Sequence, residues 1–206
     1  MTILRFLCQH VGADAARHTV AVLFIAFAVV APALPVSAQS SPTTTVIVVR
    51  HAEKGDDDPA DPKLSAAGSR RAEALAVALA DSGVGSIITT HLKRTKMTAA
   101  PLAARSGVKP TVLSVKRGDV TAHIADLVAA VDAARARRNG AILVVGHSNT
   151  VPLLIKALSG VLDAHMCDSQ YAHLFVLTLG VTATEPVRLV RATYGDADPA
   201  TVADCR

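Results

Sequence analysis

The chain has 206 residues, which is enough for one domain with a hydrophobic core of ordinary size. Its formal net charge is only +4, and its aromatic side chains are limited to two Tyr and four Phe, with no Trp. Proteins that bind nucleic acid usually combine a dense basic surface with aromatic side chains on which bases stack. The composition therefore argues against nucleic acid as a partner.

The first 38 residues predict a signal peptide. Basic residues precede the apolar run "TVAVLFIAFAVVAPALPV" (residues 19–36), small residues follow it, and cleavage is expected after Ala38. A transmembrane anchor is the alternative, but Pro32 and Pro35 interrupt the run and no charged stop-transfer cluster follows. We therefore expect an exported protein, periplasmic or secreted, that meets a membrane only through an uncleaved signal segment.

Cleavage would leave a short polar lead-in, residues 39–43, and one domain over residues 44–206. Cys8 is removed with the signal peptide, whereas Cys167 and Cys205 remain. In an exported chain these two cysteines can form a disulfide, and two free thiols are the alternative that the sequence leaves open. Nothing in the sequence sets the oligomeric state.

Strand-like and helix-like segments alternate along the domain. Residues 44–50, "TTVIVVR", form a continuous β-branched run, which is typical of a strand buried on both faces of a parallel sheet. Ser65 stands where an N-cap is expected, and the apolar spacing after it predicts a helix over 66–81. The other expected strands are 85–90, 110–115, 141–146, 173–180 and 186–195, and the other helices are 92–105, a helix from Asp119 to the basic end "RARRNG", and 150–158. This alternation predicts a three-layer α/β/α fold with a mostly parallel central sheet, and it allows an antiparallel pair at the C-terminal end.

Four polar side chains follow the ends of predicted strands. They are Arg50 and His51 after the first strand, Arg94 after the second, and His147 after the fourth. Ligands of an open parallel sheet bind outside the carboxyl ends of its strands. Arginine matches phosphate oxygens with a fork of donors, and of two histidines one can be a neutral nucleophile while the other is held protonated. Since phosphoryl transfer needs mainly positioning and positive charge, the set predicts a phosphate site that uses no metal and no cofactor.

Three motifs in order resemble those of the histidine phosphatase superfamily, which includes cofactor-dependent phosphoglycerate mutases and small phosphohistidine phosphatases. They are "VVRHAEK" with Arg50 and His51, "TTHLKRTKMTAA" with Arg94, and "VVGHSNT" with His147, and the likeness extends over roughly residues 44–178. The resemblance implies that His51 takes the phosphoryl group and that the other three side chains form the pocket around it. It implies a phosphatase that acts on phosphomonoesters through a phosphohistidine, with a small phosphorylated compound or a phosphoprotein as substrate.

Two positions depart from the family's pattern, and one role has no clear residue. Ala52 replaces the usual glycine, and Thr90 replaces the usual serine but keeps a hydroxyl. The proton donor for the leaving oxygen is unassigned, because Asp119 is better explained as the N-cap of a helix. Glu53 is the other candidate, but it is as well explained as a surface partner of Lys54.

Three other functions stay open. A phosphomutase of the same family is disfavoured by the lack of obvious insertions around the motifs and by the predicted export. A catalytically idle protein that binds a phosphorylated ligand would follow if the proton donor is missing. A zinc hydrolase would use His51, Glu53, His91 and His147, but two arginines in the same site would repel a cation.

The loops carry less information. The stretch "DDDPADP" (residues 56–62) lacks the ligand spacing of an EF-hand and is expected to be a solvated loop at the rim of the site. Asp168 and Tyr171 are candidates for the mouth of the pocket, although no pattern places them there. Loops 55–63 and 116–120 should set the specificity, but they match no pattern that identifies the natural substrate.

Overall fold

The computed structural model describes residues 43–160, 166–182 and 185–199. The predicted signal peptide, most of the lead-in and Cys205 lie outside these ranges. Among the helices that the structure describes, none combines the length and apolar character needed to cross a bilayer. The described part of the domain contains six strands and four helices.

The strands form one mixed sheet in the order β3-β2-β4-β1-β5-β6. Strands β1 to β4 pair in parallel, whereas β5 is antiparallel to both β1 and β6. The predicted mostly parallel sheet, with an antiparallel pair at the C-terminal end, is confirmed. The strands are β1 (Thr44–Arg50), β2 (Val84–Thr90), β3 (Thr111–Leu113), β4 (Ala141–Gly146), β5 (His173–Leu179) and β6 (Arg188–Thr193).

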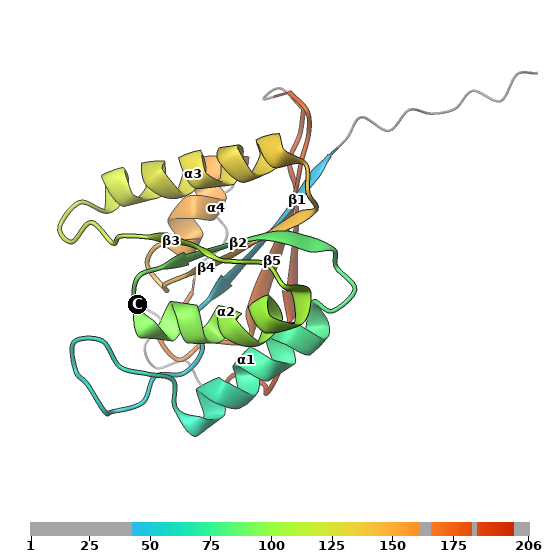
Figure 1. The fold of residues 1–206 in the computed structure, drawn as a ribbon. Helices are drawn as coiled ribbons and strands as arrows, with labels where there is room; N and C mark the ends of the chain where they lie inside the picture. The colour runs from blue at the N-terminus through green and yellow to red at the C-terminus, as the bar shows by residue number, and fades with distance from the viewer. Residues whose placement is uncertain (1–42, 161–165, 183–184, 200–206) are drawn as a thin grey trace, which may run out of the picture. The chain divides into compact units, whose positions relative to one another are not determined.

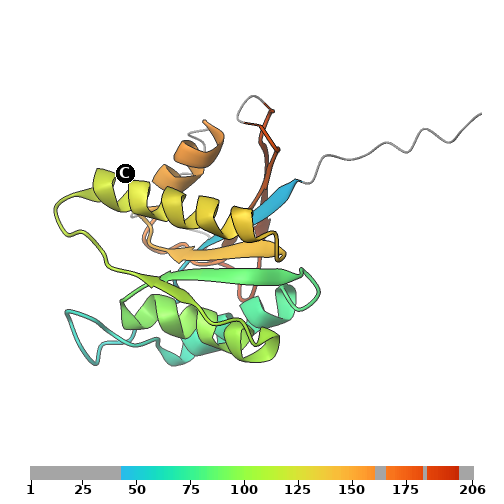
Figure 2. The same ribbon diagram turned by 45° about the horizontal axis from the view of Figure 1, so that its top comes forward.

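Helices cover both faces of this sheet (Figure 1). α1 (Ala66–Ala78) and α2 (Lys93–Ser106) pack on one face, and α3 (Val120–Arg137) and α4 (Val151–Ser159) pack on the other. Figure 2 shows the same order of layers from a second direction, with the strands between the two pairs of helices. The predicted three-layer α/β/α arrangement is therefore confirmed.

Residues 46–49 of strand β1 are all apolar, and the structure explains this pattern. Successive side chains of a strand point to opposite faces of the sheet. Val46 and Val48 lie in the core beneath α3 and α4, while Ile47 and Val49 lie in the core beneath α1 and α2. All four are at most 3% exposed. Each such side chain contributes roughly 1.5–3 kcal/mol on burial, so both cores hold this strand, and the residue that follows it, in place.

The largest differences from the predicted boundaries are at two ends. The helix predicted over 66–81 ends at Ala78, and the chain then turns through Gly83, whose φ of +64° lies in the left-handed region that glycine favours. The third strand is only three residues long instead of six, and it lies at the edge of the sheet, where it pairs with β2 alone. Neither difference moves a predicted site residue.

Residues 166–172, which precede β5, are held at two places. Cys167 is buried and disulfide-bonded, which excludes a free thiol at this position, and its expected partner Cys205 lies outside the described residues. At the other end, the carboxylate of Asp198 accepts hydrogen bonds from the backbone N–H groups of Tyr171 and Ala172, at 2.7 and 2.9 Å. The segment is thus fixed against the carboxyl edge of β1.

Candidate active site

Strand pairing brings the first and third motifs together. β1 and β4 are in parallel register with Arg50 opposite Gly146, and the backbone N–H of His51 donates to the Gly146 carbonyl at 2.9 Å. The rings of His51 and His147 therefore become neighbours, with centroids 5.3 Å apart. Gly146 lets the start of α4 pack closely on the end of β4, because an added Cβ would lie 3.1 Å from Cγ2 of Val151.

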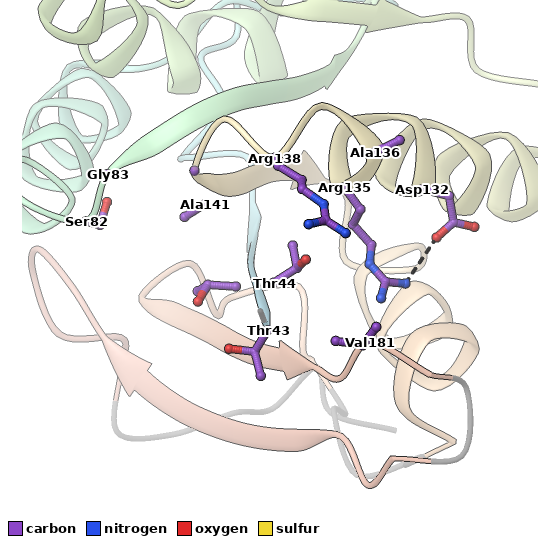
Figure 3. Close-up of a pocket in the computed structure, with 12 residues that line it drawn as sticks. Thr43, Thr44, Ser82, Gly83, Asp132, Arg135, Ala136, Arg138, Ala141 and Val181 are labelled. Carbon is purple, nitrogen blue, oxygen red and sulfur yellow. Dashed lines mark hydrogen bonds and ion pairs between the residues drawn. The ribbon is translucent and has the colours of Figure 1, made fainter. Parts of the chain in front are cut away.

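The structure gathers all four predicted side chains around one cavity. This cavity has a volume of about 570 Å³ and is lined by Arg50, His51, Arg94 and His147, among others. A larger cavity of about 690 Å³ opens at the amino ends of the strands, and Figure 3 shows it beside the ion-paired Arg135. Its lining contains no histidine or cysteine, so it offers no nucleophile of the predicted kind. The smaller cavity is therefore the candidate active site.

His51 is held as a neutral ring with a defined tautomer. The ring is 4% exposed, and its Nδ1 lies 2.8 Å from the backbone carbonyl of Ala52. A carbonyl can only accept, so Nδ1 carries the proton and the lone pair is on Nε2. Burial, together with the nearby cations, lowers the pKa of His51 to about 2. His51 can thus act as a nucleophile at any physiological pH.

His147 is also neutral, which corrects one sequence-based expectation. One histidine was expected to be held protonated, but burial and then the positive charge of Arg94 lower the pKa of His147 to about 3. Its Nε2 lies 3.3 Å from Oγ1 of Thr90, which in turn lies 2.8 Å from Oγ1 of Thr95. Thr90 therefore keeps a hydroxyl at the site, as expected for its replacement of serine. The positive charge of the pocket comes from arginine and lysine.

Arg50 is fixed by backbone carbonyls. It is 3% exposed, and its Nη1 donates to the carbonyl oxygens of Cys167, Asp168 and Gln170 at 2.8–3.0 Å. Its guanidinium also lies 4.0 Å from the centroid of the Tyr171 ring, a cation–π contact. The anchored residues 166–172 thus set the position of this arginine.

Arg94 enters the site from the first turn of α2. The same helix also holds the chain that follows His51 in place. The side chain of Arg94 is 17% exposed, and its Nη1 lies 3.8 Å from Oδ1 of Asp61. One turn further on, Thr98 donates to the Arg94 carbonyl at 2.7 Å and accepts from the backbone N–H of Ala52 at 2.9 Å. Ala52 itself is fully buried, so the residue beside the nucleophile is packed against the helix that carries Arg94.

Neither candidate for the proton donor faces the cavity. Asp119 is the N-cap of α3, with Oδ1 accepting from the backbone N–H of Ala122 at 2.9 Å. Glu53 pairs with the buried guanidinium of Arg71 through bonds of 2.8–3.0 Å, so its expected pairing with Lys54 is wrong. The helix that carries Arg71 packs so tightly here that a Cβ at Gly68 would collide with the Glu53 carbonyl. Glu53 therefore anchors the motif loop to α1.

The rim of the cavity contains both residues that the sequence offered as candidates for the mouth of the pocket. Asp168 and Tyr171 both line it, and Asp168 is the one carboxylate among the lining residues that the structure describes. The aspartate-rich loop holds the start of α2: Asp61 accepts from the backbone N–H of Lys93, and Asp58 pairs with the Lys93 ammonium at 3.1 Å. The loop is thus a structural rim, as expected.

The residues of the zinc alternative do not converge. Glu53 is paired with Arg71, and the ring of His91 accepts a hydrogen bond from the backbone N–H of Val115 at 3.1 Å. Within residues 43–160, 166–182 and 185–199, no cluster of three or more His, Cys, Asp or Glu side chains is arranged to hold a metal ion. The geometry gives this alternative no support.

The two histidines of the candidate active site predict a loss of stability in mild acid. In the unfolded chain each ring binds a proton near its ordinary pKa of about 6.5, whereas in the folded protein each stays neutral down to about pH 2–3. The unfolded state therefore gains protons first, and stability falls as the pH drops below about 6.5. For the pair, we expect the free energy of unfolding to be roughly 3 kcal/mol smaller at pH 5.5 than at pH 8.

Urea denaturation at several pH values in a phosphate-free buffer measures this loss. His147→Gln removes one of the two titrating rings, so the variant should show roughly half of the pH dependence that the pair contributes. Unfolding energies that stay constant from pH 8 to 5.5 would contradict the neutral state assigned to both rings.

The fold and the four gathered side chains define the kind of site expected for phosphoryl transfer. Residues 46–115 match the family model described as histidine phosphatase superfamily (branch 1). The predicted relationship to this superfamily is therefore confirmed, and the match supports phosphatase or mutase activity. No curated protein matches the sequence significantly.

Solved structures share the fold at low sequence identity. One is a protein histidine phosphatase SixA complexed with tungstate, at 15% identity and a TM-score of 0.56 over 73% of this chain and 97% of that one. The mycobacterial glucosyl-3-phosphoglycerate phosphatase is 17% identical, with a TM-score of 0.55 over 73% and 98%. Phosphoglycerate mutase from Bacillus anthracis is 14% identical, with a TM-score of 0.56 over 74% and 94%. At these identities the likeness extends to the fold alone.

Proposed function

We propose that this protein is a phosphatase that hydrolyses phosphomonoesters through a phosphohistidine at His51, without a metal ion. The observation that carries the proposal is the Nε2 lone pair of a neutral, buried His51 in one cavity with two arginines and a second imidazole. Phosphoryl transfer requires little more from a protein than a nucleophile and fixed positive charge.

The chemistry follows from these positions. Nε2 of His51 attacks phosphorus while the bond from phosphorus to the leaving oxygen breaks, and Arg50 and Arg94 stabilise the charge on the remaining oxygens. The leaving oxygen takes its proton from water. Water then attacks the phosphohistidine, which releases inorganic phosphate and restores the neutral ring.

A generic aryl phosphate tests this proposal, because a phenolate leaves without needing a strong proton donor. We expect turnover that is unchanged by excess chelator, and a phosphorylated enzyme that survives an alkaline quench and is labelled at His51. Turnover that disappears with chelator would favour the zinc hydrolase. Phosphate binding without turnover would favour the idle binding protein, and transfer to an added phosphate acceptor in place of water would favour the mutase.

We further propose that the protein works outside the cytoplasm on a small phosphorylated compound or a phosphoprotein. Two features support this proposal. Residues 1–38 have the order of basic, apolar and small residues that is typical of a signal peptide. Cys167 forms a disulfide, and such bonds persist mainly in oxidising compartments. Cell fractionation and N-terminal sequencing would test it, and a cytosolic protein that retains residues 1–38 would contradict it.

A further inference from the structure

The candidate active site has more positive charge than one phosphoryl group requires. Its wall contains four cationic side chains and one described carboxylate, Asp168. Arg50 and Arg94 flank the proposed nucleophile and serve the transferred group. The other two cations are Lys54 and Arg117.

Lys54 and Arg117 have no hydrogen-bonded or ion-paired side-chain partner among the described residues. Lys54 is positioned through its backbone by a β-bridge to Leu64 and follows Glu53, which is paired with Arg71. Arg117 lies in the loop between β3 and α3, and its positive charge is one of the influences that lower the pKa of Arg94. The two cations therefore approach the same cavity from different loops.

Most of the acidic side chains near these two cations are engaged with other groups. Three acids of the rim loop pair with other cations, and so does Asp126 on α3, while Asp119 caps the start of that helix. The pairs are Asp57 with Lys63, Asp58 with Lys93, Asp61 with Arg94, and Asp126 with Lys116, at 2.8–3.9 Å. Two cations remain unbalanced on the wall of a cavity that also holds two arginines, and this arrangement strongly favours an added negative charge.

Space for the rest of a substrate lies on the Arg117 side. A hollow of about 280 Å³ adjoins the candidate active site and shares Val115 and Arg117 with it. Its lining includes Val120 and His123, and burial holds the pKa of His123 below its ordinary value. This hollow can take an uncharged linking portion, while Arg117 remains at the boundary between the two spaces.

We propose that Lys54 and Arg117 form a second anion-binding site, so that the substrate is a phosphomonoester with a further carboxylate or phosphate group. This inference rests on the proposed function, because it assumes that the scissile phosphate occupies the pocket of Arg50 and Arg94. Charge-assisted hydrogen bonds to the second group would then select doubly anionic substrates over neutral-tailed ones.

Paired phosphonates test the site without depending on turnover. The full-length protein is titrated by calorimetry with alkylphosphonates and with ω-carboxyalkylphosphonates of two to five methylene groups. We expect the best carboxylated compound to bind about tenfold tighter than its alkyl partner, as one charge-assisted contact would give. Lys54→Ala and Arg117→Ala should each reduce this ratio severalfold, and the double variant should bring it close to one.

Lys109→Ala is the matched control, because it removes the same charge from an exposed position outside both cavities. It should keep the wild-type ratio, and thermal unfolding should show that all variants are folded. Equal binding of the two series to the wild-type protein, or a ratio unchanged in the double variant, overturns the second site alone. Failure of every phosphonate to bind overturns the proposed function, and this inference with it.

Discussion

Replacing His51 with alanine should reduce kcat on an aryl phosphate by roughly 10³-fold or more, the scale of loss expected when a covalent nucleophile is removed. The structure offers no equivalent substitute among the described residues of the cavity. The other imidazole, His147, directs its Nε2 toward the hydroxyl of Thr90. This variant should also form no phosphorylated enzyme. Quenching a reaction with labelled substrate would measure the amount of phosphorylated enzyme.

The His51→Ala substitution should impair the chemical step and leave phosphate binding intact. The hydrogen bonds of Arg50 to backbone carbonyls and the ion pair of Arg94 with Asp61 do not involve the His51 ring, so His51→Ala should still bind inorganic phosphate in calorimetry. His91→Ala is the matched control, because His91 follows the same sheet edge but does not line the cavity, and its turnover should stay within about threefold of wild type. Turnover of His51→Ala within tenfold of wild type would place the nucleophile elsewhere.

The main features of the fold were predictable because the local pattern of apolar residues indicates how each element is buried. Residues 46–49 are apolar at every position, and the structure buries them alternately in two cores. A strand buried on both faces needs helices on both sides, and a mostly parallel sheet collects its carboxyl ends at one edge. His51 and His147 are therefore expected to lie close together, and the parallel pairing of β1 with β4 brings them together in the structure.

Contacts that depend on backbone or on distant charges could not be predicted in the same way. The carbonyl groups that hold Arg50 belong to residues 167–170. Every residue has a backbone carbonyl, so the sequence does not indicate which of them hold an arginine. The pairing of Glu53 with Arg71 competes with an equally plausible adjacent lysine, and only the packing of α1 decides between them. The neutral state of His147 results from its depth of burial, which residue type alone does not reveal.

Replacing Arg94 with alanine should lower kcat/KM for an aryl phosphate by roughly 10²–10³-fold, the usual cost of one preorganised donor to transition-state charge. Arg94 is the better test of the phosphate pocket than Arg50, because Arg50 also satisfies three backbone carbonyls and its removal would disturb the fold. Arg94→Lys should recover only part of the loss, since an ammonium keeps the charge but not the two-donor fork.

The neighbouring residue provides the matched control for Arg94. Lys93 lies in the same turn of α2 and loses the same charge on substitution, but it pairs with Asp58 and does not line the cavity. Lys93→Ala should therefore retain kcat/KM within about fivefold, because it removes an exposed ion pair only. If both alanine variants lost activity equally, the contribution of Arg94 would be long-range charge and not a contact with the phosphoryl oxygens. A loss confined to Arg94 would instead require its guanidinium at the reacting group, where the start of α2 and the Thr98 contact with Ala52 hold it beside His51.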